Sequence, residues 1–215
     1  MSAVALRAAL ALAVLATLTA VGCDDPAKDK SRATTAASQA VTVAAPSSGA
    51  TELKFSSATG SKIAWVGSKV TGKHEGGFSD LKGTVRLVDG APEKSSVHVD
   101  IDAASITSDA EKLTGHLKSP EFFDVGKFAN ITFDSTSVKA GGDKGATHTV
   151  TGNLALHGVT KAVTFPATIK IEGEGASVEA EFSLNRRDFE LTYPGKKDDL
   201  IRDDVVVKLS VKAKK

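Results

Sequence analysis

A two-residue alternation of apolar and polar side chains runs through most of this 215-residue chain, and it limits the possible folds more than any other feature. Successive side chains of a β-strand point to opposite faces, so this period is typical of strands with one buried face. The pattern is clearest between residues 95 and 103, in the order Val97, His98, Val99, Asp100, Ile101. Turn pairs such as Asp89-Gly90 and Gly141-Gly142 separate the alternating segments. We therefore predict antiparallel β structure.

The segments amount to about eight strands, so the chain is predicted to be all-β. Strands are expected over residues 52–57, 61–71, 81–88, 95–103, 130–139, 147–156, 161–172, 176–189 and 200–211. The segment 72–77, GKHEGG, is expected to be a turn, and residues 194–199 a polar loop. Pro166 predicts that its strand lies at a sheet edge or is bulged. One-faced strands joined by short turns suit either a sandwich or a closed barrel, and periodicity does not choose between them.

One stretch, Ser105 to Phe133, interrupts the β pattern with a short helix, expected at about residues 109–118. Ser108 and Glu111 have the spacing of a capping box, and Pro120 prevents the helix from continuing.

The predicted helix has one apolar stripe, formed by Ala110, Leu113 and Leu117. Phe122, Phe123 and Phe128 follow it closely. We expect the helix and these aromatic rings to plug one end of a barrel or to line the mouth of a cavity.

The N-terminus has the pattern of an export signal. Arg7 is the one charge in the first 22 residues, and the apolar run 8–21 is too short to span a bilayer but long enough for a signal peptide. The run ends in Thr-Ala-Val-Gly-Cys, where Cys23 is the single cysteine of the chain. This ending resembles the lipobox of bacterial lipoproteins, which implies cleavage after residue 22 and a diacylglycerol on Cys23. The alternative is an ordinary secretory signal with an incidental cysteine.

We therefore divide the chain into a lipoprotein signal peptide (1–22), a lipid-anchored flexible linker (23–51) and a β domain (52–215). The linker is rich in Ala, Ser, Thr, Lys and Asp and has no aromatic residue, so it is expected to be disordered. A flexible chain of that length spans roughly 30 Å. The resemblance to a lipobox implies an exported protein at the periplasmic face of a membrane. In enteric bacteria an aspartate directly after the lipidated cysteine keeps a lipoprotein in the inner membrane, and Asp24 has that position here. The sequence does not decide between the inner and the outer membrane.

Composition and motif spacing exclude several classes of function. The formal charge of +1, without a basic stripe, argues against a nucleic-acid partner. No two of the five histidines lie at i, i+2 or i, i+4, and an acylated Cys23 leaves no thiol nucleophile. His98, Asp100 and Asp102 share one face and could form a metal site, but a solvated outer face is the preferred interpretation. We expect no catalytic residue, no metal and no cofactor.

A set of short motifs in a fixed order covers nearly the whole β domain, from Leu53 to Lys212. They are Gly77-Phe78 with Leu81 and Gly83, Ser105-Ile106, His116-Leu117-Lys118-Ser119, Glu121-Phe122-Phe123-Asp124, Lys127-Phe128, Ile131-Thr132-Phe133, Gly152-Asn153-Leu154, Gly158-Val159-Thr160-Lys161 and Arg187-Asp188-Phe189. In these motifs the chain resembles the YceI-like family of exported polyisoprenoid-binding proteins. It departs from the family at Leu113-Thr114, where Arg-Asp is common, and at Ala129, where proline is common.

The resemblance implies a lipocalin-like antiparallel β-barrel that holds a long isoprenoid chain. Residues that would line its interior are Phe78, Val99, Ile101, Leu117, Phe122, Phe123, Phe133, Leu154, Leu156, Phe165, Phe182 and Phe189. Each could instead be ordinary core packing, since small barrels can also be filled by side chains. Polar candidates for the rim are His116, Arg187 and Asp188. The alternative for His116 is a satisfied core histidine, and Arg187 and Asp188 would form a rim salt bridge or recognise a lipid headgroup.

The predicted function is an envelope-tethered binding protein for an isoprenoid or similar amphiphilic lipid. The partners would be that lipid and, through the N-terminal anchor, a membrane; no feature specifies an oligomeric state. The alternative is a structural or interaction lipoprotein with a filled barrel. An enzyme acting on an isoprenoid would need a base or nucleophile inside the barrel, where the predicted inward positions are nearly all apolar.

Overall fold

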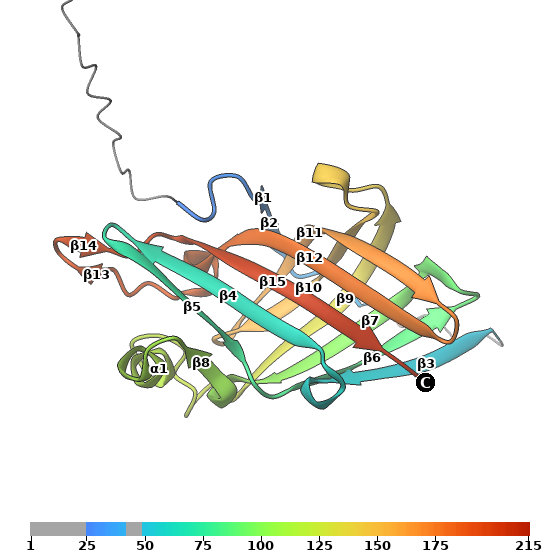
Figure 1. The fold of residues 1–215 in the computed structure, drawn as a ribbon, viewed down its shortest axis with the longest axis horizontal. Helices are drawn as coiled ribbons and strands as arrows, with labels where there is room; N and C mark the ends of the chain where they lie inside the picture. Colours follow the sequence, from blue (N-terminus) through green and yellow to red (C-terminus); the bar gives the residue numbers. More distant parts are fainter. Residues whose placement is uncertain (1–24, 42–48) are drawn as a thin grey trace, which may run out of the picture.

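The computed structural model describes residues 25–41 and 49–215, which form one curved 13-stranded sheet and a small hairpin (Figure 1). The main path of the sheet is β3-β6-β7-β9-β10-β11-β12-β15-β4-β5-β8. The strands are β1 (Ser31–Arg32), β2 (Thr34–Ala37), β3 (Ala50–Ser56), β4 (Lys62–Lys69), β5 (Gly72–Phe78), β6 (Leu81–Val88), β7 (Ala91–Asp102), β8 (Ile106–Ser108), β9 (Asn130–Ala140), β10 (His148–Leu156), β11 (Val159–Glu172), β12 (Gly175–Asn185), β13 (Gly195–Lys196), β14 (Asp199–Leu200) and β15 (Asp204–Ala213).

Within the described ranges there is one α-helix, α1 (Glu111–Lys118), and there are short 3₁₀ turns at Ser57–Thr59, Ala103–Ser105, Asp143–Gly145 and Arg186–Phe189. In these ranges no helix is long and apolar enough to cross a membrane. The helix lies at one end of the curved sheet, next to β8 and opposite the end that carries the C-terminus (Figure 1).

Pairing between distant strands curls the sheet into a barrel. β15 pairs antiparallel with β12 on one flank and with β4 on the other. Beyond its contact with β4, the chain returns to β3, where Lys54 and Lys214 exchange two backbone hydrogen bonds of 2.7 and 3.0 Å. This confirms the all-β, lipocalin-like antiparallel barrel with one short helix, and it decides against a sandwich.

The alternation predicted for β7 is confirmed. Val97, Val99 and Ile101 face the interior, while His98 lies on the outer face. There Nδ1 of His98 is 2.7 Å from Asp134 and Nε2 is 3.1 Å from Asp100. The bond to Asp134 raises the pKa of the imidazole above its usual value, against the opposing effect of burial.

The third member of the considered metal trio, Asp102, points elsewhere and accepts a hydrogen bond from the Ala104 backbone at 2.9 Å. Across the described residues no group of three or more His, Cys, Asp or Glu side chains is arranged to hold a metal ion.

The segment predicted as a turn, residues 72–77, is instead part of strand β5, which pairs with β4 and β8. Its glycines misled the prediction because they serve close packing. A Cβ atom on Gly76 would lie 2.0 Å from the carbonyl oxygen of Thr107 and 2.4 Å from the ring of Trp65. Glycine inside a strand marks such a close approach.

The prediction of a flexible linker is wrong for residues 25–41, which we call the N-terminal strap. β1 pairs parallel with β12, and β2 pairs antiparallel with β11. Side chains fix the strap as well: Ser31 donates to Asp143 at 2.7 Å, and Thr35 donates to Asp188 at 2.7 Å. The composition argument counts only apolar surface, whereas the strap is held by backbone pairing and polar contacts. Cys23, Asp24 and residues 42–48 lie outside the described residues.

Helix α1 confirms the expected helix, but the predicted capping box is wrong. The N-cap is Ala110, which has no side-chain cap. Ser108 belongs to β8, and its hydroxyl accepts the Ala110 N–H at 3.2 Å, while its own N–H donates to Thr114 Oγ1 at 2.9 Å. Thr114 therefore takes the part assigned to Glu111.

Pro166 lies where β11 changes partner on one flank. Residues 161–164 pair with β2, and residues 168–172 pair with β12. Among the described residues, Pro166 thus has a strand neighbour only in β10, opposite Thr149. This fits the expected local edge, because proline has no N–H to donate.

We predict that Gly76→Ala lowers the free energy of unfolding by about 1–3 kcal/mol, because the added methyl group has no space between Trp65 and Thr107. Gly72→Ala, at the start of the same strand with no atom within 4 Å of a new Cβ, is the matched control. Urea unfolding measures both. Equal midpoints for the two variants would contradict the packing role of Gly76.

Candidate functional site: an apolar cavity inside the barrel

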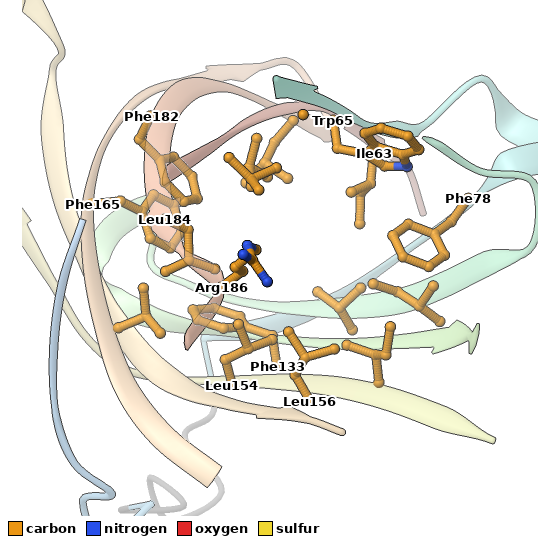
Figure 2. Close-up of a pocket in the computed structure, with 18 of the residues that line it drawn as sticks. Ile63, Trp65, Phe78, Phe133, Leu154, Leu156, Phe165, Phe182, Leu184 and Arg186 are labelled. Atoms are coloured by element: carbon orange, nitrogen blue, oxygen red, sulfur yellow. The ribbon is translucent and has the colours of Figure 1, made fainter. Parts of the chain in front are cut away.

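A cavity of about 700 Å³ occupies the interior of the barrel. Figure 2 shows side chains from several strands directed into it, including Ile63 and Trp65 from β4, Phe133 from β9, and Leu154 from β10. Nearly all of the wall is apolar. Ligand sites of proteins fall in this size range and are predominantly apolar.

Glycines on the wall allow aromatic rings to lie flat against it. Trp65 of β4 stands directly opposite Gly76 of β5, and its ring occupies the space of the missing side chain. Phe133 of β9 does the same over Gly152 of β10, where a Cβ would lie 2.3 Å from the ring. Both rings line the cavity. Rings held in this way do not project across the interior, which keeps the space open.

A row of phenylalanines forms one side of the cavity. The ring centroids of Phe165 and Phe182 are 4.4 Å apart and the rings are stacked, and Phe133 packs 5.8 Å from Phe165 at a tilt of 52°. Aromatic pairs at these distances favour offset or tilted arrangements. The row gives a continuous apolar surface across β9, β11 and β12.

Helix α1 and the aromatic cluster cover one end of the cavity. Leu117 and Phe122 are buried with Ile106, and Phe123 packs edge-on against Phe78 at 6.0 Å. His116 lies among these rings, 4.9 Å from Phe122 and 4.8 Å from Tyr193, while its Nε2 contacts Glu121 at 2.6 Å. This position matches the expectation that the helix and the aromatic rings close one end of the barrel.

Polar lining residues gather mainly at the same end, which we call the mouth. The residues at this end include Lys69, His74, Lys112, His116, Tyr193, Lys196 and Asp199. Lys69 forms an ion pair with Asp199, and His74 contacts Asp109 at 2.9 Å. The cavity is therefore asymmetric, with an apolar body and a polar mouth beside α1 and the β13–β14 hairpin.

Arg186 is a buried cation in the wall that was not among the predicted site residues. Its side chain is 5% exposed and lies within the cavity view of Figure 2. Nε donates to the carbonyl of Arg202 at 3.1 Å, Nη1 to that of Leu191, and Nη2 contacts Asp203 at 3.1 Å. Burial lowers the pKa of the guanidinium below its usual value, whereas the charge of Asp203 acts in the opposite direction.

These contacts use most of the donors of Arg186, so its main effect is to hold the segment 191–203 against the end of β12. In the sequence, Arg186 belongs to a charged cluster that follows an apolar strand. The signal that could have identified it as buried is its spacing, because it lies two residues after Leu184 and so continues the inward-facing positions of β12.

All of the predicted lining residues except Phe189 line the cavity. Phe189 is fully buried in the core behind the wall. Of the rim candidates, His116 lines the mouth, but Arg187 and Asp188 do not line the cavity. The 3₁₀ turn Arg186–Phe189 explains this, because it directs Arg186 inward, Arg187 toward Asp203 and Asp188 toward Thr35 of the strap.

The family model of the YceI-like domain matches residues 50–213. The chain belongs to the YceI-like domain family. A UPF0312 protein of Pseudomonas fluorescens is 40% identical over 136 residues, which are 60% of this chain and 70% of that protein. Protein YceI of Salmonella arizonae is 38% identical over 123 residues, which are 54% of this chain and 63% of that protein.

Solved structures share the YceI-like fold at lower identity. BcnA of Burkholderia cenocepacia is 23% identical with a TM-score of 0.61, over 71% of this chain and 96% of BcnA. A polyisoprenoid binding domain from Saccharophagus degradans is 17% identical with a TM-score of 0.57, over 75% of this chain and 97% of that domain. These likenesses support the lipocalin-like barrel.

We predict that Arg186→Ala lowers the free energy of unfolding by roughly 3–5 kcal/mol, because it leaves the carbonyl groups of Leu191, Ile201 and Arg202 without the donor that Arg186 supplies. Arg187→Ala removes an exposed partner of the Asp203 carboxylate and should cost less than about 1 kcal/mol. Urea unfolding of both variants measures the difference. A similar loss for the two would show that Arg186 does not hold the 191–203 segment.

Proposed function

We propose that this protein binds a long apolar lipid, an isoprenoid or a similar amphiphile, inside its barrel while tethered at the cell envelope. The observation that carries the proposal is the open apolar cavity with its polar groups gathered mainly at one end. The class of ligand is supported by the related fold of the Saccharophagus degradans domain, which is described as polyisoprenoid-binding.

The chemistry of the wall suits such a ligand. Burial of one isoprene unit gains roughly 3 kcal/mol before the costs of ordering, so a few units supply useful affinity without hydrogen bonds. Recognition would then depend on the length and width of the apolar chain. The polar end of an amphiphile would lie at the mouth, where Lys69, Lys112 and Lys196 can reach it.

We predict that Leu209→Trp reduces the bound lipid at least tenfold, because the indole ring would project from β15 into the cavity. A loss of about 1.4 kcal/mol in binding free energy is enough for a tenfold reduction. Lys208→Trp is the matched control, since Lys208 is the preceding residue and its side chain lies on the outer face with Glu181. Native mass spectrometry of the protein extracted from membranes, and then titrated with a polyprenol, measures occupancy.

The alternative function is a structural or interaction protein with no lipid in its barrel. A barrel that carries no lipid after extraction and takes up no polyprenol would overturn lipid binding and favour a structural or interaction protein. Unfolding curves of the two Trp variants check that a loss of binding does not come from loss of the fold.

The tether rests on the lipobox at Cys23. We predict that the N-terminal peptide of the mature protein begins at Cys23 and carries a diacylglycerol, and that Cys23→Ser abolishes this lipid, because serine has no thiol to form the thioether. Fractionation followed by mass spectrometry of the N-terminal peptide measures this. An N-terminal peptide of the unchanged protein that lacks the lipid would contradict an anchor at Cys23.

A further inference from the structure

Two exposed apolar side chains lie next to each other at the mouth of the cavity. Val70, in the β4–β5 turn, and Leu200, in β14, are each 51% exposed. The N–H of Val70 donates to the carbonyl of Leu200 at 3.2 Å, and Lys69 and Ile201 are bridge partners. The β4–β5 turn and the β13–β14 hairpin project together at the end of the barrel that also carries α1 (Figure 1).

This apolar pair borders the polar end of the cavity. Lys196, Asp199 and Ile201, from the same hairpin region, line the mouth. A surface that covered Val70 and Leu200 would therefore also face this end of the cavity.

The beginning of the N-terminal strap is fixed beside this pair. Asp25 forms an ion pair with Arg202 at 3.4 Å, and the N–H of Arg202 donates to the carbonyl of Ser68 at 2.9 Å. Arg202 is two residues beyond Leu200, and Ser68 is two residues before Val70. Ala27 continues the attachment by packing against Val66 and Val206.

The covalent distance from this point to the anchor is short. Cys23 precedes Asp25 by two residues, which span at most about 7 Å. A free linker of the full length between Cys23 and the barrel would span roughly 30 Å and would permit any orientation. Because the strap is docked, a lipid on Cys23 would enter the bilayer close to Val70 and Leu200.

The charges of the hairpin region are compatible with a phosphate-bearing surface. This region contains three lysines, Lys69, Lys196 and Lys197, and two aspartates, Asp198 and Asp199. Lys69 is already paired with Asp199. Lys196 and Lys197 have no ion-pair partner within residues 25–41 and 49–215 and are exposed. The net charge of these five side chains is one positive charge. Electrostatic attraction to a membrane would therefore be weak, and the anchor and the apolar pair would mainly determine which end of the barrel faces the membrane.

We propose that the mouth end of the barrel rests on the lipid bilayer, with Val70 and Leu200 in contact with the lipids and the cavity opening toward the membrane. This rests on the proposed anchor at Cys23. In this orientation an apolar ligand passes between the bilayer and the cavity without crossing bulk water.

The test measures membrane contact at each end of the barrel. The full acylated protein carries one added cysteine, Val70→Cys or Leu200→Cys, which is the free thiol once Cys23 is acylated. Glu174→Cys is the matched control: Glu174 is exposed and pairs with Lys215 at the opposite end, near the C-terminus (Figure 1). An environment-sensitive fluorophore is attached, and the protein is placed in vesicles of phosphatidylethanolamine and phosphatidylglycerol that contain a nitroxide-labelled lipid.

We expect a blue-shifted emission and strong quenching by the nitroxide at positions 70 and 200, and emission as in water at position 174. Equal quenching at both ends, quenching at 174 alone, or no quenching at 70 and 200 overturns the proposal. Mass spectrometry of the N-terminal peptide precedes the measurement, and an unmodified Cys23 overturns the anchor and this orientation together. Repeating the assay with Leu209→Trp separates orientation from lipid binding, since the quenching pattern should persist when the cavity is blocked.

Discussion

β15 pairs with strands on both of its flanks, and the enclosed interior depends on this pairing. The strand is the last long element of the chain, yet it joins β12 to β4 and returns through Lys214 to Lys54 of β3. Its inward residues, from Val205 to Val211, line the cavity. Before β15 is in place, the earlier hairpins have an apolar face and nothing to cover it. Closure therefore rests on contacts between residues far apart in sequence, which are slow to form because loop entropy is lost first.

A closed barrel of this size can be filled by its own side chains, so the open interior needs a separate cause. Two aromatic residues of the wall, Trp65 and Phe133, lie over glycines of neighbouring strands. With a side chain at either glycine, the ring above it would have to turn toward the lumen. The glycines thus act on the volume of the cavity through the orientation of rings on the next strand.

The sequence was sufficient to predict most of the wall and one of the three rim residues. Alternation alone identified the inward face of β7, since Val97, Val99 and Ile101 line the cavity. The resemblance to the family then favoured a barrel over a sandwich. Periodicity could not do so, because closure depends on pairing of β15 with β4 and β3, which lie far away in the sequence. The same limit explains β5: its glycines are typical of a turn unless the ring of Trp65 on the neighbouring strand is known to lie over them. The strap was missed because its partners, Asp143 and Asp188, are more than a hundred residues away.

The Arg187-Asp188-Phe189 motif has a structural role, which its contacts in the 3₁₀ turn reveal. The sequence left a rim salt bridge and headgroup recognition as alternatives, and Arg187 does form a salt bridge, with Asp203. Asp188 accepts a hydrogen bond from the hydroxyl of Thr35, and Phe189 is fully buried. Directly before the motif, Arg186 turns into the wall and holds the carbonyls of residues 191 and 202. One short turn therefore connects the cavity wall, the segment 191–203 and the N-terminal strap. The motif thus fixes the position of the polar end of the cavity relative to the strap.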